Sequence, residues 1–231
     1  MKYFLTGGGD QEYFRDLDRR FLNELPLHST VLILPMACER EDYLDVYDRI
    51  SSEFSSRKIT HFDLCEDINK INYQKLCEYD ALIFEGGNTF KLINELRESR
   101  FFKFLQDYCQ LNKCIYADSA GAIVLGSDVQ TAFMGDDADE DEHKLQDYRG
   151  LGLLKEWSMH CHFSIDERDQ IQELIYSTGS SVLCLPEETG VLLDTNITPE
   201  SIEIFGELPA TIVGFAGISK LSPGSIHYTD H

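Results

Sequence analysis

In the first half of the chain, short apolar runs alternate with stretches in which apolar residues recur every three or four positions. The apolar runs predict strands at Lys2–Thr6, Val31–Met36, Ile59–Leu64, Ala81–Phe84 and Cys114–Ala117. The amphipathic stretches predict helices at 11–24, 40–55, 72–78, 89–96 and 100–111. Strands that alternate with helices in this way predict an α/β fold, in which a mostly parallel sheet is flanked by helices.

After residue 150 the pattern changes. One helical stretch is predicted at 166–177, and short strands follow one another closely at 159–163, 181–185, 190–194, 201–205 and 210–214. This spacing predicts a C-terminal antiparallel extension, or a small second sheet that closes the same domain. Because neither a repeat nor a Pro/Ser-rich linker interrupts the sequence, we expect residues 1–231 to form a single domain.

The composition limits the class of protein. Of 231 residues, 42% are hydrophobic and 11% aromatic, which is typical of a globular protein. The first residues do not resemble a signal peptide, and no apolar run approaches the ~18 residues of a membrane span. Seven scattered cysteines without C-x-x-C spacing suit reduced thiols and a cytoplasmic location. The net charge of −21 repels phosphate groups, so nucleic acids and membranes are not expected as partners.

The strand predicted at Cys114–Ala117 leads through Asp118 directly into Ser119, and small helix-forming residues follow. A strand, a sharp turn at a serine and a helix together form a nucleophile elbow, which pushes the hydroxyl clear of the backbone. The residues two positions before and after the serine are Ala117 and Gly121, which are small enough for such a turn. The N–H of Ala120 would then face an oxyanion on the substrate. A plain helix N-cap is the alternative.

Two glycine clusters follow predicted strands, where open α/β sheets carry their sites. The run Gly7–Gly9 lacks the G-x-G-x-x-G spacing of a dinucleotide loop, so we do not expect a nucleotide there. In Glu85-Gly86-Gly87-Asn88-Thr89, Gly87 is the candidate for a second oxyanion donor and Asn88 for a substrate-binding residue. The alternative is a strand–helix turn that Asn88 or Thr89 caps.

A serine nucleophile needs a base, which is most often histidine. Among seven histidines, His160 and His162 fall in a predicted strand, whose alternation would place both on one face. A third ligand with suitable spacing for a metal ion is lacking, so we expect no metal and take one of the two as the base. The orienting carboxylate could come from Glu187 or Glu188 after a strand, or from an aspartate at 136–137.

These motifs resemble one family. The A-D-S-A-G-A run at 117–122 and the G-G-N turn at 86–88 are its most specific elements, and the early G-G-G loop, G-L-G-L-L at 150–154, H-F at 162–163 and P-E-E-T-G at 186–190 agree with it. The chain resembles the serine peptidases that include aspartyl dipeptidase (peptidase E) and cyanophycinase, which are similar to class I glutamine amidotransferases with serine as nucleophile. The resemblance implies Ser119 as nucleophile and His162 as base.

The two branches of this family imply different third members. The cyanophycinase branch implies Glu187, and the dipeptidase branch implies Asp136 or Asp137. We favour Glu187, because the acidic run that begins at Asp136 is expected to stay solvated. Glu187 follows an apolar strand and Pro186, a setting expected to shield it from water, with Glu188 pointing outward.

The dipeptidase branch also implies that Arg168 binds the substrate's aspartate carboxylate; the alternative is a solvated residue in the first turn of a helix. The sequence therefore predicts a serine hydrolase that cleaves a short peptide or isopeptide bond, next to an aspartyl residue if the dipeptidase branch applies. Neither a metal nor an organic cofactor is expected, the partner is a small peptide, and the chain is expected to be a monomer or homodimer. The alternatives are a cyanophycinase-like isopeptidase on aspartyl-arginine units, which an acidic pocket would favour, and a catalytically silent binding protein of the same fold.

Overall fold

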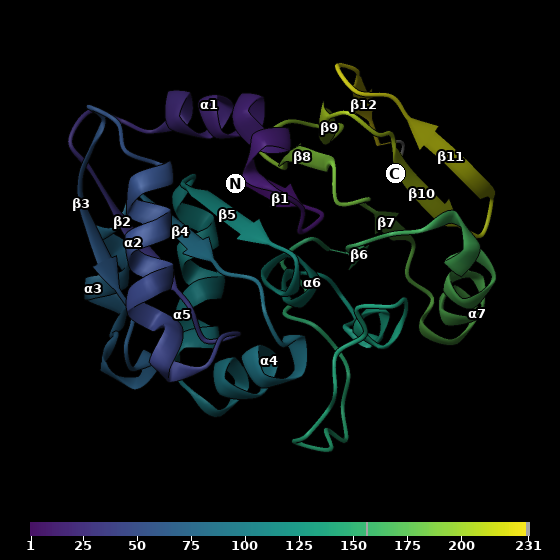
Figure 1. Cartoon of the computed structure of the whole chain (residues 1–231), viewed down its shortest axis with the longest axis horizontal. Helices are drawn as coiled ribbons and strands as arrows, with labels where there is room; N and C mark the ends of the chain where they lie inside the picture. Colours follow the sequence, from purple (N-terminus) through teal and green to yellow (C-terminus); the bar gives the residue numbers. More distant parts are fainter. Residues whose placement is uncertain (156, 230–231) are drawn as a thin grey trace.

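The computed structural model describes residues 1–155 and 157–229, and eight strands of this part form the main sheet in the order β12-β9-β8-β1-β5-β4-β2-β3 (Figure 1). The parallel strands are β1 (Lys2–Thr6), β2 (Ser29–Leu34), β3 (Ile59–Leu64), β4 (Ala81–Phe84) and β5 (Cys114–Asp118). The antiparallel extension consists of β8 (Thr189–Asp194), β9 (Ser201–Gly206) and β12 (Ile226–Tyr228). The predicted α/β fold with a mostly parallel sheet and an antiparallel C-terminal extension is confirmed.

A second, smaller sheet also forms in the C-terminal part, where four strands of the described chain lie in the order β11-β10-β7-β6. Its strands are β6 (Ser158–His160), β7 (Val182–Cys184), β10 (Ala210–Gly214) and β11 (Gly217–Leu221). The sequence left open an extension or a second sheet, and both are present. One face of this sheet packs against α7 (Arg168–Thr178), because Ile171 and Ile175 share a core cluster with Val182 and Val213.

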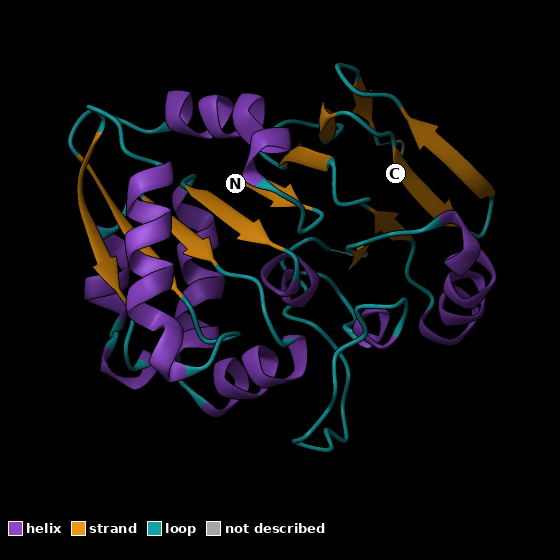
Figure 2. Ribbon diagram, viewed as in Figure 1, coloured by secondary structure: helices purple, strands orange, loops and turns teal. Residues whose placement is uncertain are grey.

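Helices cover both faces of the main sheet (Figure 2). Strand alternation determines which side chain meets which layer: Val31 and Ile33 of β2 pack with Phe21, whereas Leu32 and Leu34 pack with Leu92. The first layer consists of α1 (Arg15–Glu24) and α2 (Tyr43–Glu53), and the second of α3 (Tyr73–Glu78), α4 (Thr89–Glu98), α5 (Phe101–Tyr108) and α6 (Ala120–Leu125). No helix within the described residues is both long and apolar enough to cross a membrane.

Short 3₁₀ helices lie in the connections: η1 (Gln11–Phe14), η2 (Arg40–Asp42), η3 (Ile68–Lys70), η4 (Cys109–Leu111), η5 (Gln130–Phe133) and η6 (Ile165–Glu167). Between η5 and β6 the chain extends away from the sheets as a long excursion, which contains the acidic run (Figure 1). We call residues 134–147 the acidic loop.

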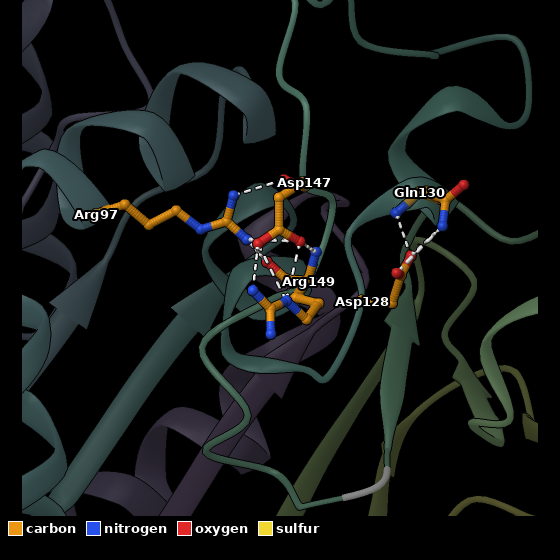
Figure 3. A network of polar contacts seen from close by, with 5 residues as sticks. All are labelled: Arg97, Asp128, Gln130, Asp147 and Arg149. Carbon is orange, nitrogen blue, oxygen red and sulfur yellow. Dashed lines mark hydrogen bonds and ion pairs between the residues drawn. The ribbon is translucent and has the colours of Figure 1, made fainter.

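The base of the acidic loop is fixed by a polar network (Figure 3). Asp128 and Arg149 form an isolated β-bridge, and Gln130 donates from its backbone to Asp128 at 2.8 Å. Arg97 of α4 reaches across and donates to the backbone carbonyls of Asp147, at 2.5 Å, and Arg149. The end of the loop is therefore anchored beside α4, and the bridge ties it to the segment that precedes η5.

Candidate active site

Ser119 lies between the end of β5 and the start of α6, and its backbone has φ 44° and ψ −112°. A positive φ is unfavourable for a residue with a side chain, so the turn is strained. The neighbours are compact: Ala117 is fully buried, and a Cβ added to Gly121 would lie 2.6 Å from the carbonyl oxygen of Phe84. The predicted strand–turn–helix is present. Ser119 occupies the N-cap position of α6, but its side chain makes no capping hydrogen bond, unlike the plain N-cap of the alternative.

A chain of hydrogen bonds begins at the serine hydroxyl. Oγ of Ser119 lies 2.8 Å from Nε2 of His162, and Nδ1 of His162 lies 3.0 Å from Oε1 of Glu187. This arrangement suits the neutral tautomer in which Nδ1–H donates to the carboxylate and Nε2 accepts from the hydroxyl. The imidazole of His162 can then accept the proton of the serine at Nε2, while the carboxylate of Glu187 stabilises the resulting imidazolium.

His162 does not share a strand face with His160, and that prediction is wrong. Strand β6 ends at His160, and His162 follows in a turn with φ 54°, its backbone N–H donating to the carbonyl of Gly7 at 3.0 Å. The alternation of a strand therefore does not apply to the pair. His160 is 2% exposed and faces Glu167, with Nε2 2.8 Å from Oε2.

The glycine run after β1 makes room for the imidazole. A Cβ at Gly8, whose φ is +97°, would lie 2.5 Å from Nε2 of His162. A Cβ at Gly9 would lie 2.4 Å from the carbonyl oxygen of Glu187. In the sequence this run lacked nucleotide-loop spacing and agreed with the family resemblance, but its contact with the imidazole was not predicted. Three consecutive glycines at the carboxyl end of a strand were the available signal for such a close approach.

Two carboxylates approach Nδ1 of His162. The side chain of Glu187 is 52% exposed and that of Asp137 68% exposed. Oδ2 of Asp137 lies 3.9 Å from the same nitrogen. The expectation that Glu187 is shielded is therefore wrong: it lies between β7 and β8 rather than in a strand, and its side chain stays half open to solvent. Asp136 lines the neighbouring cavity without a hydrogen bond to His162.

The same three side chains, Asp137, His162 and Glu187, offer donor atoms that all lie within 4.8 Å of one another. Within the described residues this is the group that could hold a metal ion. Its imidazole is the one that bridges Ser119 and Glu187, so an ion bound at Nδ1 would replace the hydrogen bond to the carboxylate.

A cavity of about 390 Å³ opens beside Ser119. Among the described residues that line it, none is lysine or arginine, and five carry carboxylates: Glu85, Asp118, Asp136, Asp137 and Asp139. The last three belong to the acidic loop, which thus forms one wall of the cavity. The site is therefore strongly acidic as well as nucleophilic.

Three of these carboxyl groups are partly buried, which changes their acidity. Burial raises the pKa of Asp118, and a hydrogen bond from the hydroxyl of Thr6 offsets this only in part. Burial also raises the pKa of Glu85, against the effect of Arg49 at 2.5 Å. The pKa of Asp139 is raised by burial too, although its carboxylate accepts from the backbone N–H of Thr89 at 2.8 Å.

The predicted oxyanion donors lie at the same site. Gly87 has φ +131°, and a Cβ there would lie 2.6 Å from the carbonyl oxygen of Ala37, so only glycine suits this position. Gly87 lines the cavity beside Ser119. Ala120 follows Ser119 directly and is the first residue of α6. An N–H at the start of a helix has no intrahelical acceptor and is free to bind an oxyanion.

The structure does not bring the side chains of Asn88 and Arg168 into the cavity. Oδ1 of Asn88 accepts from the backbone N–H of Lys91 at 2.8 Å and caps α4, while Nδ2 donates to the carbonyl of Glu140 at 2.9 Å. Arg168 is exposed at the start of α7 and pairs with Asp169. Asn88 is thus the helix cap, and Arg168 the solvated residue in the first turn of a helix, that the sequence left open as alternatives.

Residues 3–197 match the family model of peptidase family S51. The chain belongs to peptidase family S51. It is therefore a serine peptidase, in agreement with the resemblance found in the sequence. No protein with a curated description matches the sequence in a direct search.

Solved structures of low identity share the S51 fold. One is a protein of Listeria monocytogenes EGD-e assigned as a peptidase E, with 18% identity, a TM-score of 0.65, and coverage of 88% of this chain and 96% of that one. Another is a peptidase from an acI-B1 Actinobacterium, with 16% identity, a TM-score of 0.73, and coverage of 99% and 96%. At these identities the likeness concerns the fold.

Proposed function

We propose that this S51 peptidase cleaves a short peptide or isopeptide bond through an acyl-enzyme at Ser119. The observation that carries the proposal is the hydrogen-bond chain from Oγ of Ser119 through His162 to Glu187, at 2.8 and 3.0 Å. A hydroxyl is weakly nucleophilic near neutral pH, and an adjacent base held by a carboxylate is the usual way to activate it.

In the proposed mechanism His162 takes the hydroxyl proton at Nε2 while Oγ attacks the scissile carbonyl carbon. The N–H groups of Gly87 and Ala120 bind the oxyanion that forms. When the tetrahedral intermediate collapses, the C–N bond breaks and His162 gives the proton to the leaving amine. Water then adds to the ester with the same base, and Ser119 regains its proton. Glu187 orients the imidazole and stabilises its charged form throughout.

The cavity supports a particular class of substrate within this reaction. Its volume of about 390 Å³ suits one or two residues rather than a long chain. An aspartyl side chain beside the scissile bond would need a cationic partner, and Arg168 lies exposed elsewhere. The acidic lining therefore favours the second candidate, cleavage next to a positively charged group, as in an aspartyl-arginine isopeptide.

A small panel of substrates tests this choice. Purified protein would be assayed with Asp-Leu, Ala-Leu, Arg-Leu and β-aspartyl-arginine, with Ser119→Ala as the blank. We expect the arginine-containing substrates to be cleaved at least ~10-fold better, in kcat/KM, than Asp-Leu, because each carboxylate in the cavity disfavours a like charge. Preference for Asp-Leu would favour the aspartyl dipeptidase activity. Absence of cleavage together with absence of labelling by a fluorophosphonate would instead favour the silent binding protein.

A further inference from the structure

A second histidine lies close to the site and takes no part in the mechanism above. His160 is the last residue of β6 and is 2% exposed, and its Nε2 lies 2.8 Å from Oε2 of Glu167. The carboxylate is also largely buried, with its side chain 12% exposed. Removing both groups from water costs free energy, which only a well-made hydrogen bond offsets.

The surroundings of His160 define its tautomer. Among the described residues Nδ1 is buried and has no hydrogen-bond partner. Because a buried N–H without an acceptor is rarer than a buried acceptor without a donor, the proton belongs on Nε2, which then donates to Glu167. A hydrogen bond from a neutral N–H to a carboxylate is charge-assisted and thus stronger than a neutral one.

Glu167 connects three parts of the chain. Besides His160, its Oε2 accepts from the backbone N–H of Ser164 at 2.9 Å, which forms a capping box at the start of η6. A Cβ at Gly135 would lie 2.5 Å from Oε1, so the carboxylate also packs against the acidic loop. Burial opposes ionisation, but the hydrogen bonds from His160 and Ser164 outweigh it and hold the pKa of Glu167 below its ordinary value.

The pair encloses the turn that carries His162. The turn begins at His160 and is closed by Glu167, and the ring of Phe163 packs edge-on against His160, with centroids 6.0 Å apart. His162 itself has the positive φ of 54° that directs its ring toward Ser119. A residue with such a backbone keeps it only where the surrounding contacts impose it.

We propose that His160 and Glu167 form a positioning pair, which holds the turn around His162 so that Nε2 stays within hydrogen-bond reach of Ser119. The inference rests on the proposed function, since it requires His162 to act as the base. Neither residue is among those that line the cavity beside Ser119. The pair acts on the rate of chemistry through the placement of His162.

The test uses Glu167→Gln, which keeps the shape but weakens the hydrogen bond, and His160→Gln as an independent variant. The matched control is Asp166→Asn, which removes one charge from an exposed neighbour in the same 3₁₀ helix. For each protein, kcat, KM and the rate of labelling by a fluorophosphonate would be measured and corrected for the folded fraction, as determined by thermal melting. Glu167→Gln would also be combined with His162→Ala.

We expect Glu167→Gln and His160→Gln to lower kcat and the labelling rate together by ~10- to 10²-fold, a range typical of a displaced reacting group, with KM within about 2-fold. Asp166→Asn should leave all three unchanged. In the His162→Ala background, Glu167→Gln should cause no further loss, because it acts through that histidine.

Unchanged rates in folded Glu167→Gln, a change in KM alone, or a full additional loss in the His162→Ala background would each overturn the positioning role. Failure of the proposed function has a different signature: the unmodified protein itself would not be labelled at Ser119.

Discussion

The peptide unit around Ser119 is held from both sides. Its N–H donates to the carbonyl of Thr6 at 3.3 Å, and its carbonyl accepts from Ala122 and Ile123 at 2.8 and 3.0 Å. An unfavourable backbone conformation costs ~1–3 kcal/mol, and hydrogen bonds of this kind contribute ~0.5–1.5 kcal/mol each. The main sheet and α6 therefore maintain the strained turn, and the hydroxyl takes no part in maintaining it.

At the same scale, the two carboxylates near Nδ1 of His162 differ in distance, 3.0 Å for Glu187 and 3.9 Å for Asp137. We expect Glu187→Gln to lower kcat by ~10²- to 10⁴-fold, as when a triad acid is neutralised, because the amide no longer stabilises the imidazolium. Since Glu187 is half exposed, water will replace part of its effect, and the lower end of the range is expected.

The comparison variant is Asp136→Asn/Asp137→Asn, for which we expect less than ~10-fold loss in kcat. Steady-state kinetics on all three proteins would check this assignment. If the double variant is inactive while Glu187→Gln remains active, the aspartate-type triad of the dipeptidase branch is the correct one.

At the scale of elements, the site depends on how α4 and the acidic loop are joined. Arg97 extends from the last turn of α4 to the carbonyls of Asp147 and Arg149, where the loop returns to the sheets (Figure 3). Hydrogen bonds from Arg149 hold the pKa of Asp147 well below its ordinary range, so this carboxylate stays charged. The loop wall of the cavity is thus anchored at its base by Arg97, and farther along by the contacts of Asp139 and Glu140 with the start of α4.

Arg97→Ala should loosen the acidic loop without affecting the catalytic groups. We expect limited proteolysis at Lys144 to become several-fold faster and KM to rise several-fold, while kcat changes by less than about 3-fold. The control is Arg100→Ala, which removes an exposed arginine nearby. Equal proteolysis rates in the two variants would show that Arg97 does not hold the loop.

At the scale of the whole molecule, β1, β2, β4 and β5 could be predicted because they are largely buried and appear as apolar runs. The edge strand β3 is partly exposed and was predicted from the apolar residues Ile59, Phe62 and Leu64. Strand β11 (Gly217–Leu221) was missed because four of its five residues are exposed and leave no apolar pattern. Ser119, His162 and Glu187 followed from motifs that are local in sequence. The contact of Gly8 with His162 and the pairing of His160 with Glu167 could not be predicted, because each depends on how separate segments pack.

A buried carboxyl group in α1 links stability to pH. Asp18 is 8% exposed and accepts a hydrogen bond from the hydroxyl of Tyr116 at 2.7 Å, and burial raises its pKa to about 6. Between pH ~4 and 6 the Asp18 carboxyl binds more protons in the folded state than in the unfolded state, so its contribution to stability falls as the pH rises through this range. The asparagine in Asp18→Asn cannot ionise. The free energy of unfolding of this variant should therefore exceed that of the original chain by ~1–3 kcal/mol at pH 7 and equal it near pH 4.

Urea denaturation at pH 4 and 7 would measure this difference, with Asp16→Asn as an exposed control in the same helix. An Asp18→Asn protein that is less stable at pH 7, or whose stability difference does not depend on pH, would contradict the buried, proton-binding role of Asp18.

That Ser119 is the nucleophile is tested most directly by mass spectrometry after reaction with a fluorophosphonate. We expect the unmodified chain to gain one phosphonyl group, which peptide mapping assigns to Ser119. Ser119→Ala should gain none and lose at least ~10³-fold in peptide turnover, with an unchanged melting temperature. The claim that Ser119 is the nucleophile would be contradicted if Ser119→Ala hydrolysed the peptide at a near-unchanged rate. It would also be contradicted if the folded, unmodified chain hydrolysed the peptide without being labelled by the probe.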